Sequence, residues 1–206
     1  LDVPTRAQAL SVARQVAPWT DWLEAGTLLI VNEGLQAVRE LRAACPKVTI
    51  VADIKIIDGA RALAESALDA GANVVTVVST AYKPMVQAAV TAARARGKQV
   101  VGEYYALYFS SPAPFERLRA LGVNALGLHL PARTEEGREE AVAAVARALP
   151  WLPLPAWLAG DVDVELLKRL RGLPLAGVIV GRAIVQAADP AGEARQVAEA
   201  LHAWRR

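Results

Sequence analysis

The chain has 206 residues, of which 54% are hydrophobic and 21% are charged. A chain of this size and composition can bury one substantial core, so we expect a single domain over residues 1–206. Its 23 Lys and Arg residues nearly balance 21 Asp and Glu residues, and the formal net charge of +2 is not gathered in a basic block. This charge pattern argues against a nucleic-acid partner.

The single cysteine and the short apolar segments bear on where the protein works. Cys45 cannot form a disulfide within the chain, which favours a cytoplasmic protein with an unreactive thiol. The apolar segments are far shorter than the roughly 20 residues that cross a bilayer, so we expect no membrane partner. The chain begins with Leu-Asp-Val rather than with Met and a basic, apolar leader. We therefore expect no signal peptide, and we expect a few initial residues to precede Leu1.

Short apolar segments alternate with segments of helical periodicity along the whole chain. Most apolar segments are unbroken runs, which is typical of strands buried on both faces of a parallel sheet. We predict strands at residues 22–24, 48–53, 73–78, 99–104, 124–129, 154–159 and 176–180. We predict helices at residues 5–16, 34–44, 58–70, 84–96, 135–148 and 162–170.

The spacing of these elements predicts the fold. Successive strands begin about 25 to 30 residues apart, which is the length of one βα unit in a barrel. Seven units are visible, and an eighth is reached if Leu1 and Asp2 end a truncated first strand. We therefore predict an α/β protein with a (β/α)8 (TIM) barrel. A doubly wound open sheet has the same periodicity and is the structural alternative.

Polar residues end several of the apolar strands, where the active site of an α/β barrel is built. In the strand that contains Asp53, a period of two directs Asp53 and Lys55 to the same side. An acid and a lysine in a barrel mouth are costly to bury unless their charges neutralise each other. A purely structural ion pair is the alternative to a functional cluster. The other polar residues at strand ends are Asp2, Glu24, Glu103 and His129.

The sequence Asp53-Ile-Lys-Ile-Ile-Asp58 resembles the Asp-x-Lys-x-x-Asp signature of the orotidine-monophosphate decarboxylase superfamily. Further segments resemble its hexulose-phosphate synthase and keto-gulonate-phosphate decarboxylase branch, in the same order along the chain. These segments are Glu24-Ala-Gly-Thr, Asn32-Glu-Gly-Leu-Gln-Ala-Val-Arg, Gly71-Ala-Asn-Val-Val-Thr-Val-Val, and Val178-Ile-Val-Gly-Arg-Ala-Ile followed by Asp189-Pro-Ala. The resemblance covers nearly the whole chain and is weaker between residues 105 and 155.

The resemblance implies a magnesium site. Orotidine-monophosphate decarboxylases have a lysine at the position of Glu24 and use no metal. The sugar-phosphate branch has a glutamate there, which binds Mg2+ together with the aspartate at the position of Asp53. Carboxylates, water and substrate are the hard oxygen ligands that Mg2+ prefers. We therefore expect Glu24 and Asp53 to bind Mg2+, and a solvated glutamate is the alternative for Glu24.

The resemblance also implies an enediolate intermediate, formed by loss of a proton or of carbon dioxide beside a carbonyl. We expect Lys55 to place positive charge near the developing oxyanion, and Asp2 to orient Lys55 or a substrate hydroxyl. His129 is expected to transfer a proton, with a polar cap at a strand end as the alternative. Glu103 matches an acidic position of the family, and a surface loop explains it equally well. The family's equivalent of Asp58 reaches the neighbouring subunit's site, which implies a homodimer with shared active sites.

The substrate phosphate is expected at the loops that follow the last two strands. Gly181 allows the backbone to approach the phosphate, and Arg182 can bind its oxygens in a bidentate manner. Relatives have two adjacent glycines in the preceding loop, whereas this chain has Gly160 and Asp161. The Asp161 carboxylate either repels phosphate and hinders a positive-φ backbone, or caps the following helix.

The leading hypothesis is a metal-dependent sugar-phosphate lyase that condenses formaldehyde with ribulose 5-phosphate, or runs that aldol reaction backwards. Decarboxylation of a keto-gulonate phosphate is the alternative among lyases. Glu103 favours the decarboxylase, while the segments that begin at Asn32 and Val178 favour the synthase. A non-catalytic sugar-phosphate-binding barrel is the alternative from another class. The joint presence of so many charged strand-end residues argues against such a binder.

Overall fold

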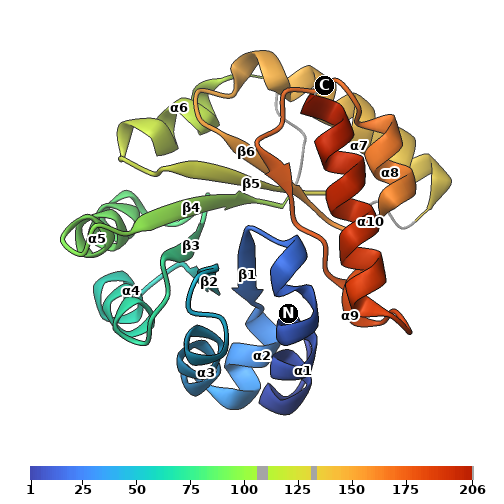
Figure 1. The fold of residues 1–206 in the computed structure, drawn as a ribbon. Coiled ribbons are helices and arrows are strands. Elements are labelled where there is room, and N and C mark those ends of the chain that lie inside the picture. The colour runs from blue at the N-terminus through green and yellow to red at the C-terminus, as the bar shows by residue number, and fades with distance from the viewer. Residues whose placement is uncertain (106–110, 131–133, 206) are drawn as a thin grey trace.

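The computed structural model describes residues 1–105, 111–130 and 134–205, and it contains a seven-stranded, all-parallel sheet. The strands are paired in the order in which they occur along the chain, so each βα unit lies beside the next. Figure 1 shows the sheet curled, with helices along its outer face. The strands are β1 (Trp22–Ala25), β2 (Thr49–Ile56), β3 (Val74–Val78), β4 (Gln99–Tyr104), β5 (Ala125–His129), β6 (Ala156–Ala159) and β7 (Gly177–Val178).

The helices alternate with these strands, and four of them begin at capping residues that the sequence supplies. The side chains of Thr5, Thr134, Asp163 and Asp189 each accept a hydrogen bond from a backbone N–H in the first turn of a helix. The α-helices are α1 (Arg6–Val16), α2 (Thr27–Glu33), α3 (Gln36–Ala44), α4 (Ala60–Asp69), α5 (Lys83–Arg94), α6 (Ala113–Ala120), α7 (Glu135–Ala148), α8 (Val164–Arg169), α9 (Arg182–Val185) and α10 (Pro190–His202). The 3-10 turns are η1 (Ala17–Trp19), η2 (Leu149–Trp151) and η3 (Ala203–Arg205).

All seven predicted strands and the alternation of strands with helices are confirmed. The expected eighth strand at Leu1 and Asp2 is not assigned as a strand. Leu1 nevertheless lies alongside β1, because its nitrogen donates to the Glu24 carbonyl and its own carbonyl accepts from Gly26 N–H. Within the described residues, the sheet therefore has seven strands and one further residue that continues its hydrogen bonding beside β1.

Alternate residues of each strand face two different cores. The residues that face the helices are fully buried, as Ile50, Val75 and Leu126 illustrate, and they pack in the large core between sheet and helices. The residues that face the inside of the curled sheet form a second apolar layer, in which the rings of Trp22 and Trp157 lie 4.7 Å apart. The other members of this layer are Val51, Val74, Val101 and Ala125. Because side chains fill this layer, the inside of the sheet is a packed core and not a channel.

The amino ends of the strands are joined by two asparagines and one arginine. The Asn73 side chain accepts from Ile50 N–H at 2.9 Å, and the Asn124 side chain accepts from Val100 N–H at the same distance. Arg42, on α3, donates to the Asn73 side chain, to the Val48 carbonyl at 2.9 Å and to the Gly71 carbonyl at 3.1 Å. One guanidinium thus satisfies carbonyls that precede β2 and β3.

No helix in the described part of the chain combines the length and the hydrophobicity that crossing a bilayer requires.

Replacing Arg42 by Met keeps the apolar stem of the side chain. It removes the guanidinium donors that bind the Asn73 side chain and the Val48 and Gly71 carbonyls. We expect the free energy of unfolding to fall by about 2–3 kcal/mol, because several partly buried carbonyls lose their partners. Chemical denaturation of the variant beside wild type measures this loss. Arg39→Met is the matched control, since Arg39 is an exposed residue of the same helix. Its effect should stay within about 0.5 kcal/mol. Equal stability of the two variants would contradict a special role for Arg42.

Candidate active site

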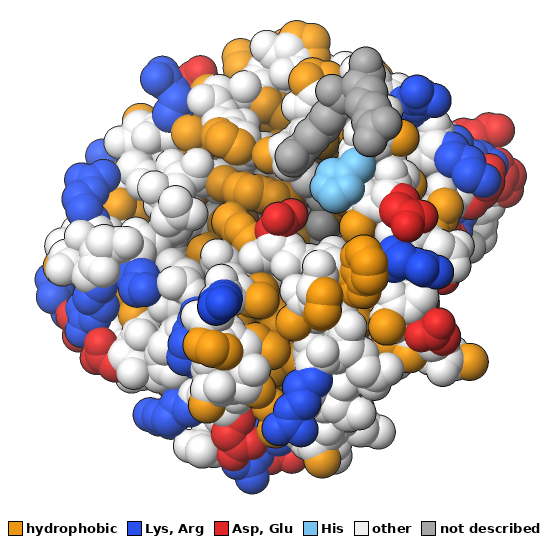
Figure 2. All heavy atoms as spheres, viewed as in Figure 1, with side chains coloured by type: hydrophobic (Ala, Val, Ile, Leu, Met, Phe, Trp, Pro, Cys, Tyr) orange, Lys and Arg blue, Asp and Glu red, His pale blue; other side chains and the backbone are white. Residues whose placement is uncertain are grey.

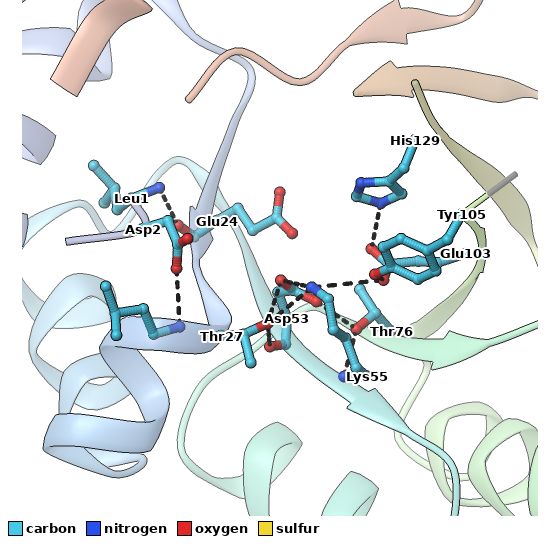
Figure 3. Close-up of polar contacts among 11 residues, drawn as sticks. Leu1, Asp2, Glu24, Thr27, Asp53, Lys55, Thr76, Glu103, Tyr105 and His129 are labelled. Atoms are coloured by element: carbon cyan, nitrogen blue, oxygen red, sulfur yellow. Dashed lines mark hydrogen bonds and ion pairs between the residues drawn. The ribbon is translucent and has the colours of Figure 1, made fainter. Parts of the chain in front are cut away.

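Three carboxylates meet at the carboxyl ends of the strands. Glu24 lies on β1, Asp53 on β2 and Glu103 on β4, and one carboxylate oxygen from each lies within 4.8 Å of the others. Each of them is two residues beyond a member of the inner apolar layer, so the strand period directs them to the same inner space. Figure 3 shows their side chains converging from these three strands. The sequence prediction that these strand ends meet is confirmed for this trio.

Burial makes the trio electrostatically unfavourable without a cation. Asp53 and Glu103 are buried, with exposed fractions of 7% and 1%. Burial, and then the negative charges of Asp53 and Glu103, raise the pKa of Glu24 to about 8. Carboxylate oxygens in this number and at this separation are the donor set of a hard divalent cation such as Mg2+. The residues present therefore fit the metal site expected from the sequence.

Lys55 supplies positive charge to this cluster. Its ammonium forms an ion pair with Asp53, donates to the Thr27 hydroxyl at 2.8 Å and lies 3.8 Å from the Glu103 carboxylate. Partial burial acts to lower the pKa of Lys55, but the charges of Glu103 and Asp53 outweigh burial and raise that pKa. Lys55 is therefore charged at neutral pH.

The backbone at Lys55 is bent to bring the ammonium back to Asp53. Lys55 has a φ of +43°, and the pairing of β2 with β3 shifts between Ala52 and Ile56. The Thr76 hydroxyl accepts from Lys55 N–H at 2.9 Å and holds this conformation. A positive φ is unfavourable for a residue with a long side chain and is found mostly at functional sites. The regular strand alternation predicted through Lys55 therefore gives way to an irregular end of β2.

Two threonines fix the position of the Asp53 carboxylate. The Thr27 hydroxyl lies 2.7 Å from one carboxylate oxygen, and the Thr76 hydroxyl lies 3.0 Å from the other. Sequence reasoning missed both as site residues. Thr27 belongs to the segment Glu24-Ala-Gly-Thr, and Thr76 occupies an inward position of its strand two residues after Val74. The strand period identifies Thr76, whereas Thr27 is the first residue of α2 and is identified only by the Glu24-Ala-Gly-Thr segment.

Glu103 connects the cluster to two rings. The Tyr105 hydroxyl donates to Glu103, and the Tyr105 ring stacks on His129 with centroids 4.4 Å apart. Burial, and then the charge of Glu103, raise the pKa of Tyr105, so its hydroxyl is a neutral donor. His129 Nε2 lies 3.2 Å from Glu103, close enough for an ion pair when the imidazole is protonated, yet it makes no hydrogen bond with a described residue. Sequence reasoning missed Tyr105, which lies in the region of weaker resemblance.

Asp2 and Asp58 lie at the edge of this arrangement. The Asp2 carboxylate accepts from Leu28 N–H at 2.9 Å, in the first turn of α2. Figure 3 shows it directed at that turn, while the partners of Lys55 are Asp53, Thr27 and Glu103. Asp58 is exposed, and its carboxylate accepts from Gly59 N–H at 2.7 Å. Within one chain, the described contacts do not bring Asp58 into the cluster.

The residues expected to hold a phosphate form a second group, after β6 and β7. Gly160 has a φ of +101°, and a Cβ there would collide with the Leu130 carbonyl, so only glycine fits. Gly181 precedes α9, and Arg182 begins it. The Arg182 guanidinium forms an ion pair with the Asp161 carboxylate. The alternative that Asp161 caps the next helix is wrong, because Asp163 is the N-cap of α8 and accepts from Leu166 N–H at 2.8 Å.

The face shown in Figure 2 carries a histidine and an acidic side chain near its centre, beside hydrophobic side chains. Most Lys and Arg side chains in this view lie towards the periphery.

Glu24→Gln tests the electrostatics of the trio. A carboxyl whose pKa rises from 4.5 to about 8 on folding destabilises the metal-free protein as the pH rises through this interval. With chelator present, we expect the variant to be more stable than wild type by about 2 kcal/mol at pH 8.5, and to match it at pH 4.5. Thermal and denaturant unfolding at both pH values measure the difference. A stability difference that does not depend on pH would contradict the raised pKa.

Comparisons with known proteins place this arrangement in a family. Residues 1–146 match the orotidine 5'-phosphate decarboxylase / HUMPS family. The chain is 30% identical to the 3-hexulose-6-phosphate synthase of Mycobacterium gastri over 203 residues, covering 98% of this chain and 97% of that protein. It is also 30% identical to the 3-keto-L-gulonate-6-phosphate decarboxylase UlaD of Escherichia coli over 202 residues, covering 95% and 91%.

The fold agrees with these sequence relatives. The 3-hexulose-6-phosphate synthase structure from Salmonella typhimurium superposes with a TM-score of 0.89 at 29% identity, covering 99% of this chain and 97% of that one. The resemblance inferred from the strand-end residues is thereby confirmed. The chain belongs to the orotidine 5'-phosphate decarboxylase / HUMPS family.

Proposed function

We propose that this protein is a metal-dependent carbon–carbon lyase that acts on a sugar phosphate through an enediolate. Its foremost reaction is the aldol condensation of formaldehyde with ribulose 5-phosphate, or the reverse. The observation that carries the proposal is the cluster of Glu24, Asp53 and Glu103 around the Lys55 ammonium. It is supported by the near full-length similarity to a 3-hexulose-6-phosphate synthase.

Glu24 and Asp53 would hold Mg2+, with Glu103 beside them. When bound, Mg2+ supplies positive charge next to the reacting oxygens of the substrate. Thr27 and Thr76 keep both oxygens of Asp53 in place, which leaves the carboxylate little freedom to rotate. Supporting contacts of this kind orient a ligand for its metal.

Lys55 and His129 would carry the charge and proton steps. The Lys55 ammonium stays protonated beside Asp53 and Glu103, so it can stabilise an oxyanion that develops next to it. His129 Nε2 lies 3.2 Å from Glu103 and lacks a hydrogen-bond partner among the described residues. This atom is therefore suited to exchange a proton with the substrate carbon. Asp2, which accepts from the first turn of α2, would position that turn and Thr27 at its start.

The phosphate of the substrate would bind after β6 and β7. Gly160 and Gly181 would allow the backbone to approach the phosphate, and the Arg182 guanidinium would supply the positive charge that binds it. In this arrangement the sugar extends from the phosphate loops to the carboxylate cluster. We also infer a single-domain barrel, with Leu1 and Asp2 in the position of a first strand beside β1.

Decarboxylation of 3-keto-L-gulonate 6-phosphate is the second candidate. The observation that favours it is the contact of Glu103 with Tyr105 and His129, because a carboxylate can stabilise an imidazolium that delivers the proton that replaces carbon dioxide. The relative UlaD, which carries that name, matches this chain at the same identity as the synthase.

A homodimer with shared sites is supported by exposed apolar side chains in the βα units on either side of Asp58. Val31 on α2 is 74% exposed, and Ile57, directly before Asp58, is 59% exposed. Leu28, Leu63 and Tyr82 are also exposed and belong to the same consecutive βα units. Such side chains on neighbouring units form an apolar surface that a second subunit can cover. Asp58 would then lie at the interface and reach the partner's site.

The proposed reaction is tested by formaldehyde consumption with ribulose 5-phosphate. We expect consumption with Mg2+, and loss of it with excess chelator. Asp53→Asn should lower the rate by a factor of about 100 or more, because the metal site and the partner of Lys55 are both lost. Asp69→Asn is the matched control and should retain wild-type rates, since Asp69 pairs with Arg96 at the end of α4. Release of carbon dioxide from the keto acid without formaldehyde consumption would favour the decarboxylase instead.

The shared site is tested by mixing two inactive variants, Glu24→Gln and Asp58→Asn. If each site takes Glu24 from one subunit and Asp58 from the other, a mixed dimer contains one intact site. Random reassociation should then restore about one quarter of wild-type activity. Activity that stays at the level of the separate variants would count against sharing.

A further inference from the structure

Asp161 has an unusual backbone conformation. Among the described residues, it and Lys55 are the only ones other than glycine with a positive φ. The conformation of Lys55 is accounted for by its bond to Thr76 and its ion pair with Asp53. Asp161 has a φ of +51° and follows Gly160, where the backbone is also in the positive-φ region. A strained backbone that persists indicates that the side chain it positions is useful.

The strained backbone places the Asp161 carboxylate on the Arg182 guanidinium. Asp161 lies in the loop after β6, and Arg182 is the first residue of α9, after β7. The Asp161 side chain is 17% exposed, whereas the Arg182 side chain is 48% exposed. The guanidinium is thus open to solvent while one of its anion-binding positions is filled by the protein itself. A guanidinium has several donors and can exchange one carboxylate partner for another anion.

We propose that Asp161 is a specificity-determining residue, an internal anion that competes with the phosphate of the substrate for Arg182. This inference rests on the proposed phosphate site of the preceding section. When a phosphorylated sugar binds, its phosphate competes with Asp161 for the donors of Arg182 and approaches a carboxylate that repels it. Asp161 therefore lowers the affinity for phosphate. Asp161 follows β6, whereas the carboxylate cluster lies on β1, β2 and β4.

An alternative role of Asp161 predicts the opposite change in phosphate affinity. If Asp161 served to hold Arg182 in place for phosphate, removing its charge would weaken binding. Asp161→Asn separates the two roles, because asparagine has nearly the same shape and tolerates a positive φ while it lacks the negative charge. The backbone is therefore retained when the ion pair is lost.

The experiment is titration calorimetry of ribulose 5-phosphate, with Mg2+ present, against wild type, Asp161→Asn, Arg182→Gln and the double variant. We expect Asp161→Asn to bind about five to ten times more tightly than wild type, because a half-exposed ion pair no longer competes. The gain should vanish in the double variant, which should bind like Arg182→Gln. Asp69→Asn changes the net charge equally, at the other end of the barrel, and should leave the affinity unchanged.

Equal or weaker binding by Asp161→Asn overturns the inference, as does a gain that persists in the double variant. Absence of measurable binding by both wild type and Asp161→Asn also overturns it, because Arg182 then has no phosphate to exchange. The proposed reaction fails separately, in the formaldehyde assay. Tighter phosphate binding by Asp161→Asn without formaldehyde consumption would leave the role of Asp161 standing and remove the proposed chemistry.

Discussion

Placing three carboxylates, two of them buried, around one ammonium is the constraint on which the rest of the site depends. Glu24, Asp53 and Glu103 repel one another, and their burial weakens the screening that water would provide. Lys55 offsets part of this charge through its ion pair with Asp53, and its own backbone adopts a positive φ. The irregular end of β2 and the threonine that holds it follow from the same requirement. The protein thus keeps an unfavourable charge arrangement that a divalent cation would relieve.

The regions that stabilise the fold are separate from this cluster. Beneath it, the layer around Trp22 and Trp157 fills the inside of the sheet with apolar side chains. At the amino ends of the strands, Arg42 and Asn73 satisfy backbone groups that would otherwise lie unpaired. Barrels commonly divide stability and function between their two ends in this way. The packed layer also limits the access of water to the carboxylates from below.

The strands and most helices were predictable because unbroken apolar runs and helical periodicity are long-range patterns. The trio of carboxylates was predictable because strand ends meet in a barrel. The short helix α2 was not predicted, since seven residues give too little periodicity to recognise. Thr76 reads as an ordinary strand residue, and the positive φ of Lys55 arises from tertiary contacts. Tyr105 was missed because its bond to Glu103 depends on the local path of the chain after β4.

The sequential strand order distributes the two tasks of the site over two halves of the chain. The charged groups of the proposed reaction lie on β1 to β4 and His129 ends β5, whereas the loops proposed for the phosphate follow β6 and β7. Mutations in one half can therefore accumulate without rearranging the other. A change such as the aspartate at position 161 alters which molecules are held while the groups that make and break bonds stay intact. Gene duplication followed by drift in the second half would be a direct evolutionary route to new substrates on this scaffold.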